Sequence, residues 1–378
     1  MQTPVRLAGG QVLAPDGSIG TADIHVADGL IADAPAQDAV TVDCRGYHVL
    51  PGIVDVHGDA FELELNPRPG VDIPFAIAMG SVDRQLLANS ITTAFHGLSV
   101  SWEPGARNLA AARRFMDGLD ALRPRLAADH RVQIRWETFA HDAIGDVERW
   151  LARDPAPAIA INDHATSTLE TVRSGDRTKL LKWAQRAGVS LDDYLAAVDT
   201  LERRAGEVAA KVSEVAGLAG RHGAVMLAHD EASRAERIAH RALGMGVSEF
   251  PIAPDAAADA VANGEHVVMG GPNAIRGGSH KGDMSAVEAI EDGLCTVLAS
   301  DYYYPSLLHA AEDLVRRGSA KLDTAWRLIS ANPAAAMALD DRGSIETGRR
   351  ADLVAVDCSG PWRLVHTVAG GALTTFGV

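Results

Sequence analysis

Several histidine and carboxylate residues of this chain directly follow short apolar segments, and they are of the types that bind divalent metal ions. The stretch YHVLPGIVDVHGDAFE, residues 47–62, contains an apolar run that ends in His57 and Asp59. Alternate residues of an extended chain point the same way, so these two side chains can face one point. Residues of the same types follow other apolar runs: Glu137, Asp163, His164, His229, Asp230, Glu231 and Asp301. Nitrogen and oxygen ligands without thiolates suit one or two ions of Zn²⁺, Mn²⁺ or Fe²⁺.

Each of these residues also has an ordinary structural interpretation. A histidine at a strand end is commonly held by a hydrogen bond, and Asp230 and Glu231 could begin a helix, where acidic residues complement the helix dipole. Asp59 could likewise cap a helix. These interpretations account for single residues, but burying many ionisable groups together is costly unless a cation compensates them. Their recurrence after at least five apolar segments therefore predicts a metal site.

The elements that would position these residues alternate along the middle of the chain. Apolar residues three and four apart indicate helices between short runs rich in Val, Ile, Ala and Thr, which are typical of strands buried on both faces. The expected strands are residues 52–57, 91–97, 132–139, 158–164, 224–231, 248–252, 266–271 and 296–301. Eight such units predict an α/β fold, a (β/α)₈ TIM barrel over residues 51–341. Catalytic groups of such barrels lie at the carboxyl ends of the strands, where the histidines and carboxylates occur.

The two ends of the chain differ from this middle part. Residues 1–50 and 342–378 contain short alternating runs interrupted by Asp-Gly and Gly-Gly turns, a pattern typical of β-structure. Neither end is long enough for a core of its own, so we expect both termini to form one small composite β-sandwich domain. Residues 165–222 are longer than a single connection requires, and they predict a helical insertion of two helices.

The composition excludes several classes of function. A formal net charge of −15 disfavours binding to nucleic acid, whose phosphates need a basic surface. No apolar segment approaches the roughly 20 residues that cross a bilayer, and the N-terminus lacks the pattern of a secretory signal, so no membrane partner is expected. The three cysteines, Cys44, Cys295 and Cys358, are far apart and favour a reducing cytoplasm over a disulfide framework. The sequence leaves open whether the chain forms a homo-oligomer.

Several motifs resemble those of the amidohydrolase superfamily, metal-dependent hydrolases on a barrel with a composite β-sandwich. The motifs are LPGIVDVHGD, the Ser-Asp pair at 300–301 and the tail SANPAAAMALDDRGSIETGRRADLVAVD. Within it, the chain is similar to the family of α-D-ribose 1-methylphosphonate 5-triphosphate diphosphatases of the carbon–phosphorus lyase pathway. That similarity spans nearly the whole chain and is carried by HGDAFE, NPRPGVDIP, INDHATS, LAHDEAS, VVMGGPNAIRGGSHKGDMSA and LASDYYYPSLLHAA. By position, the resemblance implies the metal ligands His57, Asp59, Glu137, His164, His229 and Asp301.

The chain departs from these families at three points. Most superfamily members have His-x-His on the first strand, where this chain has His57-Gly-Asp59. After DHAT the narrower family often has a Pro-Gly-Gln segment, whereas this chain continues with STLETVR. Glu137 follows the third expected strand, although superfamily members commonly bridge their metals with a lysine on the fourth strand. A glutamate bridge is also known within the superfamily.

A triphosphate substrate requires local cations in a protein that is acidic overall. The segment PNAIRGGSHKGD follows the seventh expected strand, and loops after strands seven and eight are the usual phosphate site of such barrels. It offers polar and basic side chains among flexible glycines: Asn273, Arg276, Ser279, His280 and Lys281. Arg68 could close the other side of the phosphates with two hydrogen bonds, and Tyr302 could pack at the mouth of the site or stack on a sugar. The alternative is a solvated, glycine-rich surface loop.

The expected reaction is hydrolysis of α-D-ribose 1-methylphosphonate 5-triphosphate, a phosphorylated ribose, to the 5-phosphate and pyrophosphate. Divalent ions would make a water acidic enough to supply hydroxide near neutral pH, and Asp301 would be the catalytic residue that accepts its proton. The hydroxide would attack the phosphorus nearest the ribose. Hydrolysis of a C–N bond, as by a deacetylase or a cyclic amidase, is the alternative. A non-catalytic protein that keeps the barrel would require lost ligands.

Overall fold

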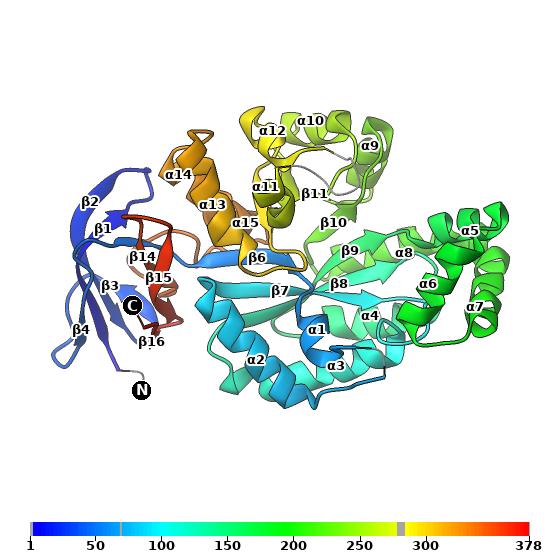
Figure 1. Cartoon of the computed structure of the whole chain (residues 1–378), viewed down its shortest axis with the longest axis horizontal. Coiled ribbons are helices and arrows are strands. Elements are labelled where there is room, and N and C mark those ends of the chain that lie inside the picture. Colours follow the sequence, from blue (N-terminus) through cyan, green and yellow to red (C-terminus); the bar gives the residue numbers. More distant parts are fainter. Residues whose placement is uncertain (1–2, 69, 278–283, 378) are drawn as a thin grey trace.

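The computed structural model describes residues 3–68, 70–277 and 284–377, and a parallel barrel forms its centre (Figure 1). The sheet has the order β13-β12-β11-β10-β9-β8-β7-β6, so consecutive strands are neighbours. Its strands are β6 Ile53–Gly58, β7 Ile91–Val100, β8 Asp129–Glu137, β9 Ala158–Asn162, β10 Met226–His229, β11 Val247–Glu249, β12 His266–Gly270 and β13 Val297–Ala299. The two ends of the sheet meet where the amide of Asp301 donates to the carbonyl of His57 at 2.9 Å. The predicted eight-stranded barrel is confirmed.

Helices cover the outside of this barrel and bury their apolar stripes against it. In α3, for example, Asn108 caps the N-terminus by accepting from the amide of Ala111, and Phe115, Met116 and Leu119 are buried. The helices of this layer are α1 Phe61–Leu65, α2 Phe75–Ala88, α3 Leu109–Leu122, α4 Ile144–Leu151, α8 Val208–Arg221, α9 Arg234–Ala242, α10 Pro254–Ala262, α11 Gly271–Arg276, α12 Ala286–Glu291, α13 Ser306–Arg317, α14 Leu322–Arg327 and α15 Ala331–Ala336, with short 3₁₀ turns at Arg123–Arg125 and His141–Ala143. Over the described residues, no helix has the length and apolar character to cross a membrane.

The two chain ends form a second, mainly antiparallel sheet with a core of its own. Its order is β16-β15-β14-β5-β1-β2-β3, and β4 pairs with β1 off this path. Its strands are β1 Val5–Leu13, β2 Ile19–Ala27, β3 Leu30–Ala32, β4 Val40–Asp43, β5 His48–Pro51, β14 Leu353–Asp357, β15 Arg363–Ala369 and β16 Ala372–Thr375. Because β5 pairs with β14, the first and last segments of the chain share one sheet, as predicted.

The segment between β9 and β10 holds more helices than the sequence analysis predicts. The sequence predicts two helices over residues 165–222, whereas the structure contains four, α5 Ala165–Ser174, α6 Arg177–Ala187, α7 Leu191–Arg204 and α8, with a 3₁₀ turn at Ala205–Glu207. The additional breaks occur at Gly175 and Gly188, whose φ angles of 74° and 73° terminate α5 and α6 in the left-handed region. The next helix is capped each time, by Asp176 and by Ser190.

Helices α5, α6 and α7, which we call the helical insertion, pack on one another at the far end of the molecule from the terminal sheet (Figure 1). Their own apolar core includes Leu169, Leu180, Tyr194 and Val198. Helix α8 returns to the barrel and packs beside α4. The helical insertion therefore extends the wall of the barrel at the side where strands β8 and β9 end.

Arg342 links the amino end of the barrel to the C-terminal segment. Its side chain is 3% exposed, and Nη1 donates at 2.7 Å to Asp129 Oδ2 and to Thr93 Oγ1. Although burial opposes it, Arg131 and Arg342 lower the pKa of Asp129 to about 2, so this carboxylate is ionised at neutral pH. Without Arg342, Asp129 would keep its contact with Arg131, but it would lose one of its cationic partners, and the buried carboxylate of Asp352 would lose a nearby positive charge.

We therefore expect Arg342→Met to lower the free energy of unfolding by about 3 to 5 kcal/mol, as for other buried ion pairs that lose one partner. Urea denaturation followed by circular dichroism measures this. The matched control is Arg363→Met, whose ion pair with Asp357 lies at the surface and should contribute less than about 1 kcal/mol. Equal effects of the two substitutions would contradict the linking role of Arg342.

Candidate metal and substrate site

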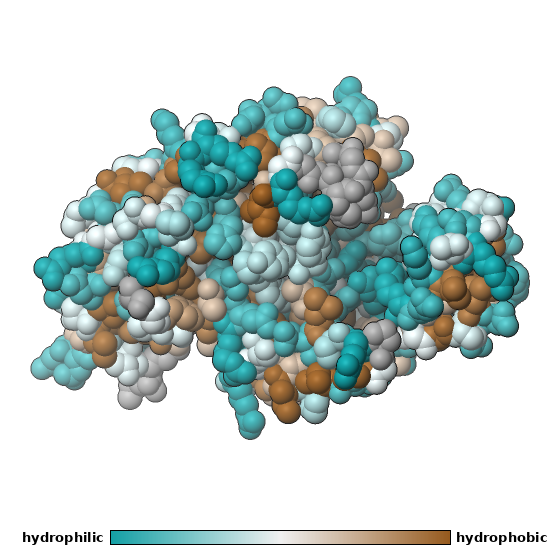
Figure 2. Space-filling view, viewed as in Figure 1, coloured by the Kyte–Doolittle hydropathy of each residue, from teal (hydrophilic) through white to brown (hydrophobic). Residues whose placement is uncertain are grey.

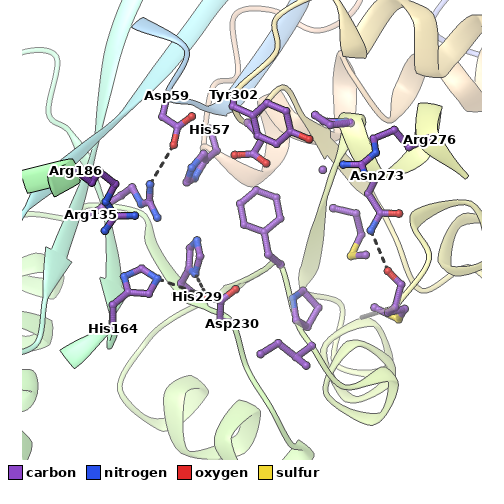
Figure 3. Close-up of a pocket in the computed structure, with 18 residues that line it drawn as sticks. His57, Asp59, Arg135, His164, Arg186, His229, Asp230, Asn273, Arg276 and Tyr302 are labelled. Atoms are coloured by element: carbon purple, nitrogen blue, oxygen red, sulfur yellow. Dashed lines mark hydrogen bonds and ion pairs between the residues drawn. The ribbon is translucent and has the colours of Figure 1, made fainter. Parts of the chain in front are cut away.

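The carboxyl ends of the barrel strands surround a cavity of about 500 Å³ (Figure 3). Five of the six predicted metal ligands line it, although they come from four different strand ends: His57 and Asp59 from β6, His164 from β9, His229 from β10 and Asp301 from β13. Barrel closure brings β6 and β13 together, so residues near the two ends of the barrel sequence become neighbours. Residues that are far apart along the chain therefore lie close together at one rim of the barrel.

Donor atoms from these residues converge in three overlapping groups. In each group one nitrogen or oxygen per residue lies within 4.8 Å of the others. The groups are His57, Asp59 and Asp301; His57, His229 and Glu249; and His164, His229 and Asp230. His57 and His229 each belong to two groups, so the three sets form one continuous cluster.

Buried donor atoms in this cluster lack hydrogen-bond partners among the described residues. Glu249 Oε2 is one of them, 3.9 Å from His229 Nε2. His229 Nδ1 is another, 3.0 Å from Asp230 Oδ2 without a hydrogen bond between them. Unpartnered polar atoms in a protein interior are costly, and a divalent cation placed among electron-pair donors satisfies them. The residues present therefore fit a divalent metal ion.

The backbone at these strand ends is unusual. Asp230 and Asp301 have φ angles of 57° and 54°, and Phe250, which follows Glu249 at the end of β11, has 52°. Aspartate tolerates this left-handed region, but for a bulky residue such as phenylalanine it is a true outlier. Strained residues of this kind cluster at functional sites, where the surrounding structure enforces them. The ring of Phe250 packs edge-on against both His57 and His229, at 5.1 and 5.3 Å between centroids.

Glu249 is a site residue that the sequence analysis misses. It is fully buried at the end of β11, and its Oε1 accepts from His57 Nδ1 at 3.0 Å and from Gln133 Nε2 at 2.5 Å. Burial opposes protonation of His57, but the Glu249 carboxylate outweighs it and raises the pKa of that imidazole. With Nδ1 held in this way, the other ring nitrogen faces Gly97, where an added Cβ would lie 3.2 Å from His57 Nε2. The absence of a side chain at position 97 leaves this nitrogen room for a ligand.

The structure positions Glu137 behind His164. Its Oε1 lies 2.6 Å from His164 Nδ1, and its Oε2 accepts from the His164 amide at 3.1 Å. The other ring nitrogen of His164 faces Asp230 Oδ2 at 3.8 Å, and the Asp230 and Glu137 carboxylates together raise the pKa of His164 to about 9. Within the described part of the chain, Glu137 belongs to none of the three donor groups.

Arg135 is a second site residue that the sequence analysis misses. Its guanidinium lies in the cavity among the metal-binding side chains. Its side chain points from β8 toward Asp59, with Nη1 at 3.4 Å from Asp59 Oδ2 (Figure 3). The residue is 8% exposed, and its Nε is buried with no partner among the described residues. A fixed, desolvated positive charge at this position interacts more strongly with an anion than a charge in water does.

The predicted substrate-binding residues have different surroundings. Asn273, Arg276 and Tyr302 line the cavity, and Asn273 and Arg276 lie on the side opposite Arg135 (Figure 3). The Asn273 side chain also bonds to Met284 O and Ala286 N. Arg68 is exposed on the connection between α1 and α2 and is absent from the described lining of the cavity. Ser279, His280 and Lys281 lie outside the described residues.

A barrel with this cluster at its carboxyl rim is characteristic of metal-dependent hydrolases, and the chain belongs to the amidohydrolase family. The model of that family matches residues 174–374. The chain is 32% identical over 333 residues to the α-D-ribose 1-methylphosphonate 5-triphosphate diphosphatase of Escherichia coli (strain K12), covering 85% of this chain and 86% of that protein. The protein is therefore a hydrolase, from a family that generally depends on divalent metal ions. Both resemblances expected from its motifs are confirmed.

Solved structures share the fold at low sequence identity. A β-aspartyl dipeptidase from Fervidobacterium islandicum superposes with a TM-score of 0.62 at 13% identity, covering 100% of this chain and 99% of that chain. A molinate hydrolase superposes with a TM-score of 0.64 at 13% identity, covering 99% of this chain and 95% of that one. These likenesses support the barrel with its terminal β domain.

Proposed function

We propose that this protein hydrolyses α-D-ribose 1-methylphosphonate 5-triphosphate to the 5-phosphate and pyrophosphate, as a metal-dependent hydrolase of phosphonate catabolism. The observation that carries the proposal is the combination of metal-binding side chains with arginines on two sides of one cavity, Arg135 and Arg276, in a protein of net charge −15. Positively charged side chains gathered in one cavity of a protein that is acidic overall indicate an anionic substrate. The similarity to the E. coli diphosphatase agrees with this chemistry.

We further propose that the clustered histidines and carboxylates hold one or two ions of Zn²⁺, Mn²⁺ or Fe²⁺. The residues assigned as ligands are His57, Asp59, His164, His229, Asp230, Glu249 and Asp301. Glu137, predicted as a ligand, is assigned here to the orientation of His164, because both of its carboxylate oxygens are bonded to that residue, whereas Oε2 of Glu249 has no partner among the described residues. A divalent ion bound there would polarise a phosphoryl oxygen and lower the pKa of water.

In the proposed reaction, Asp301 accepts the proton of the attacking water, and the water oxygen forms a bond to the phosphorus nearest the ribose. The bond from that phosphorus to the bridging oxygen breaks, and pyrophosphate leaves with the electron pair. Arg135 stabilises the negative charge that grows on the transferring phosphoryl oxygens. Arg276 holds the terminal phosphates at the other side of the cavity.

Glu249→Gln tests the assigned role of Glu249 at the metal. We expect the affinity for Zn²⁺ or Mn²⁺ to fall by about 10- to 100-fold, because the amide lacks the negative charge and replaces one carboxylate oxygen with an NH2 group that cannot bind a cation. Competition with a chromophoric chelator measures this affinity without any turnover. Glu265→Gln, which alters a carboxylate paired with Arg241 outside the cavity, is the control. An unchanged metal affinity in Glu249→Gln would reject the assignment.

Arg276→Ala tests the proposed phosphate contact. Hydrogen bonds to charged groups contribute about 1.5 to 3 kcal/mol, so KM for the triphosphate should rise about 10- to 100-fold with a smaller change in kcat. Arg317→Ala removes an exposed arginine paired with Asp313 on α13 and serves as the control. A KM equal to that of the unmodified enzyme would show that Arg276 does not bind the phosphates.

Phosphorus NMR and proton NMR assays on a panel of substrates test the function as a whole. Ribosyl triphosphates, nucleoside triphosphates and N-acyl amino acids are each incubated with the metal-loaded enzyme. The proposal expects pyrophosphate from the ribosyl triphosphate in preference to the others. Release of acetate or of a free amine, without pyrophosphate, would instead support hydrolysis of a C–N bond.

A further inference from the structure

A second cavity, which we call the insertion pocket, opens beside the metal site at the base of the helical insertion. It has a volume of about 240 Å³ and shares Asp59, Arg135, His164 and Arg186 with the larger cavity. Helix α5 follows His164 directly, and α6 carries Arg186, so the insertion itself builds one wall. On the face shown in Figure 2, hydrophilic residues gather where the insertion meets the barrel.

The lining of the insertion pocket combines aromatic rings with hydroxyl groups and paired charges. Trp102 and Trp183 contribute rings, and Ser99, Ser101 and Ser167 contribute hydroxyls. Aromatic faces bind apolar ring surfaces, while hydroxyls and charged groups at the edge exchange hydrogen bonds with a polar ligand. This mixture suits a sugar better than it suits a bare chain of phosphates.

Two of the three arginines that line the insertion pocket, Arg107 and Arg186, are paired with carboxylates. Arg107 pairs with Glu62 at 2.7 Å, and Arg186 pairs with Glu103 at 3.5 Å. Glu103 is in turn held by the hydroxyl of Tyr194, a buried residue of the insertion core, at 3.0 Å. A pocket with balanced charges has little attraction for a highly charged triphosphate tail. It can still bind a ligand with one anionic substituent.

Arg135 lies at the junction of the two cavities, and its buried Nε lacks a partner among the described residues. Figure 3 shows Arg135 and Arg186 on one side of the metal-binding side chains and Arg276 on the opposite side. A sugar triphosphate likewise extends in two directions from the phosphorus that is attacked. One direction carries the sugar and the other carries the two phosphates that leave.

We propose that the insertion pocket binds the sugar end of the substrate, a pentose with an anionic substituent, while the leaving phosphates extend toward Arg276. The inference rests on the proposed function. It gives the helical insertion a role in specificity, because Trp183 and Arg186 come from α6. Arg135 then contacts the phosphoryl group that joins the two ends.

The test compares two substrates, the ribosyl triphosphate and inorganic triphosphate, which lacks the sugar. In Trp183→Ala, KM for the ribosyl triphosphate should rise about tenfold more than KM for inorganic triphosphate, because an aromatic contact with the sugar is lost. In Arg276→Ala, the two KM values should rise by similar factors. Trp362→Ala, in the terminal β domain, is the matched control. Equal effects of Trp183→Ala on both substrates would overturn the proposal.

Direct binding of ribose 5-phosphate, measured by calorimetry, separates this proposal from the proposed reaction. Its affinity should fall about tenfold in Trp183→Ala and in Arg186→Gln, the latter being a substitution at a half-exposed side chain that folding tolerates. Arg276→Ala should affect it less. If no triphosphate is hydrolysed but ribose 5-phosphate binds with this pattern, the pocket assignment stands and the proposed reaction fails. If ribose 5-phosphate does not bind, or binds equally to all variants, the pocket assignment is overturned.

Discussion

Asp301→Asn is expected to reduce kcat by about 10³-fold while the protein still binds its metal, because a general base typically contributes 10²- to 10⁴-fold. The substitution is nearly isosteric, and asparagine tolerates the left-handed backbone, φ 54°, that Asp301 adopts. The backbone hydrogen bonds that close the barrel here involve the amide and carbonyl of residue 301, not its side chain. Remaining donors, including His57, His229 and Glu249, would keep the ion bound.

Metal content by mass spectrometry and kcat for the ribosyl triphosphate are measured on the same preparation of Asp301→Asn. Asp163→Asn is the matched control, because Asp163 also follows a barrel strand but its carboxylate is bonded to Thr166. A kcat within tenfold of the unmodified enzyme would remove Asp301 from proton transfer. A parallel loss of metal and activity would make it a ligand only.

Arg135→Met has the second largest expected effect, a fall in kcat of about 10²- to 10³-fold, the usual cost of removing one donor that stabilises transition-state charge. Methionine retains much of the length of arginine, and the space over Gly97, where an added Cβ would lie 3.2 Å from Arg135 Cδ, remains filled. The loss should therefore come from the missing charge rather than from a collapsed cavity.

Arg135→Lys separates charge from geometry, because lysine keeps the charge but lacks the planar fork of donors. We expect it to recover part of kcat. Kinetics at saturating substrate, with urea denaturation as the check on folding, measure both variants. If Arg135→Met changes KM but leaves kcat intact, Arg135 contributes only to binding of the ground state.

Much of the fold could be predicted from sequence because its signals are local. All eight barrel strands overlap the predicted apolar runs, since burial on both faces requires continuous apolar residues. The breaks at Gly175 and Gly188 are also local signals, and giving each glycine more weight would have predicted the extra helices. Strand ends likewise brought five of the six predicted ligands to one cavity.

The remainder of the site depends on contacts between distant parts of the chain. Glu249 lies in a three-residue strand, and its place in the site depends on its hydrogen bond with His57, which lies 192 positions earlier in the sequence. Arg135 looks like an ordinary charged residue of β8 until closure of the barrel turns it toward Asp59. Nothing in the local sequence distinguishes these two residues from charges that face solvent. Glu137 is the opposite case. The sequence predicts its position at a strand end correctly, but only the structure shows that its carboxylate bonds to His164.

The most direct measurement of the central claim is hydrolysis of the ribosyl triphosphate in ¹⁸O-labelled water, followed by phosphorus NMR. Attack at the phosphorus nearest the ribose predicts one labelled oxygen in the 5-phosphate and none in pyrophosphate, with turnover that depends on added divalent metal. Label in pyrophosphate, or release of single phosphates, would contradict the proposed arrangement of water, Asp301 and substrate in this cavity.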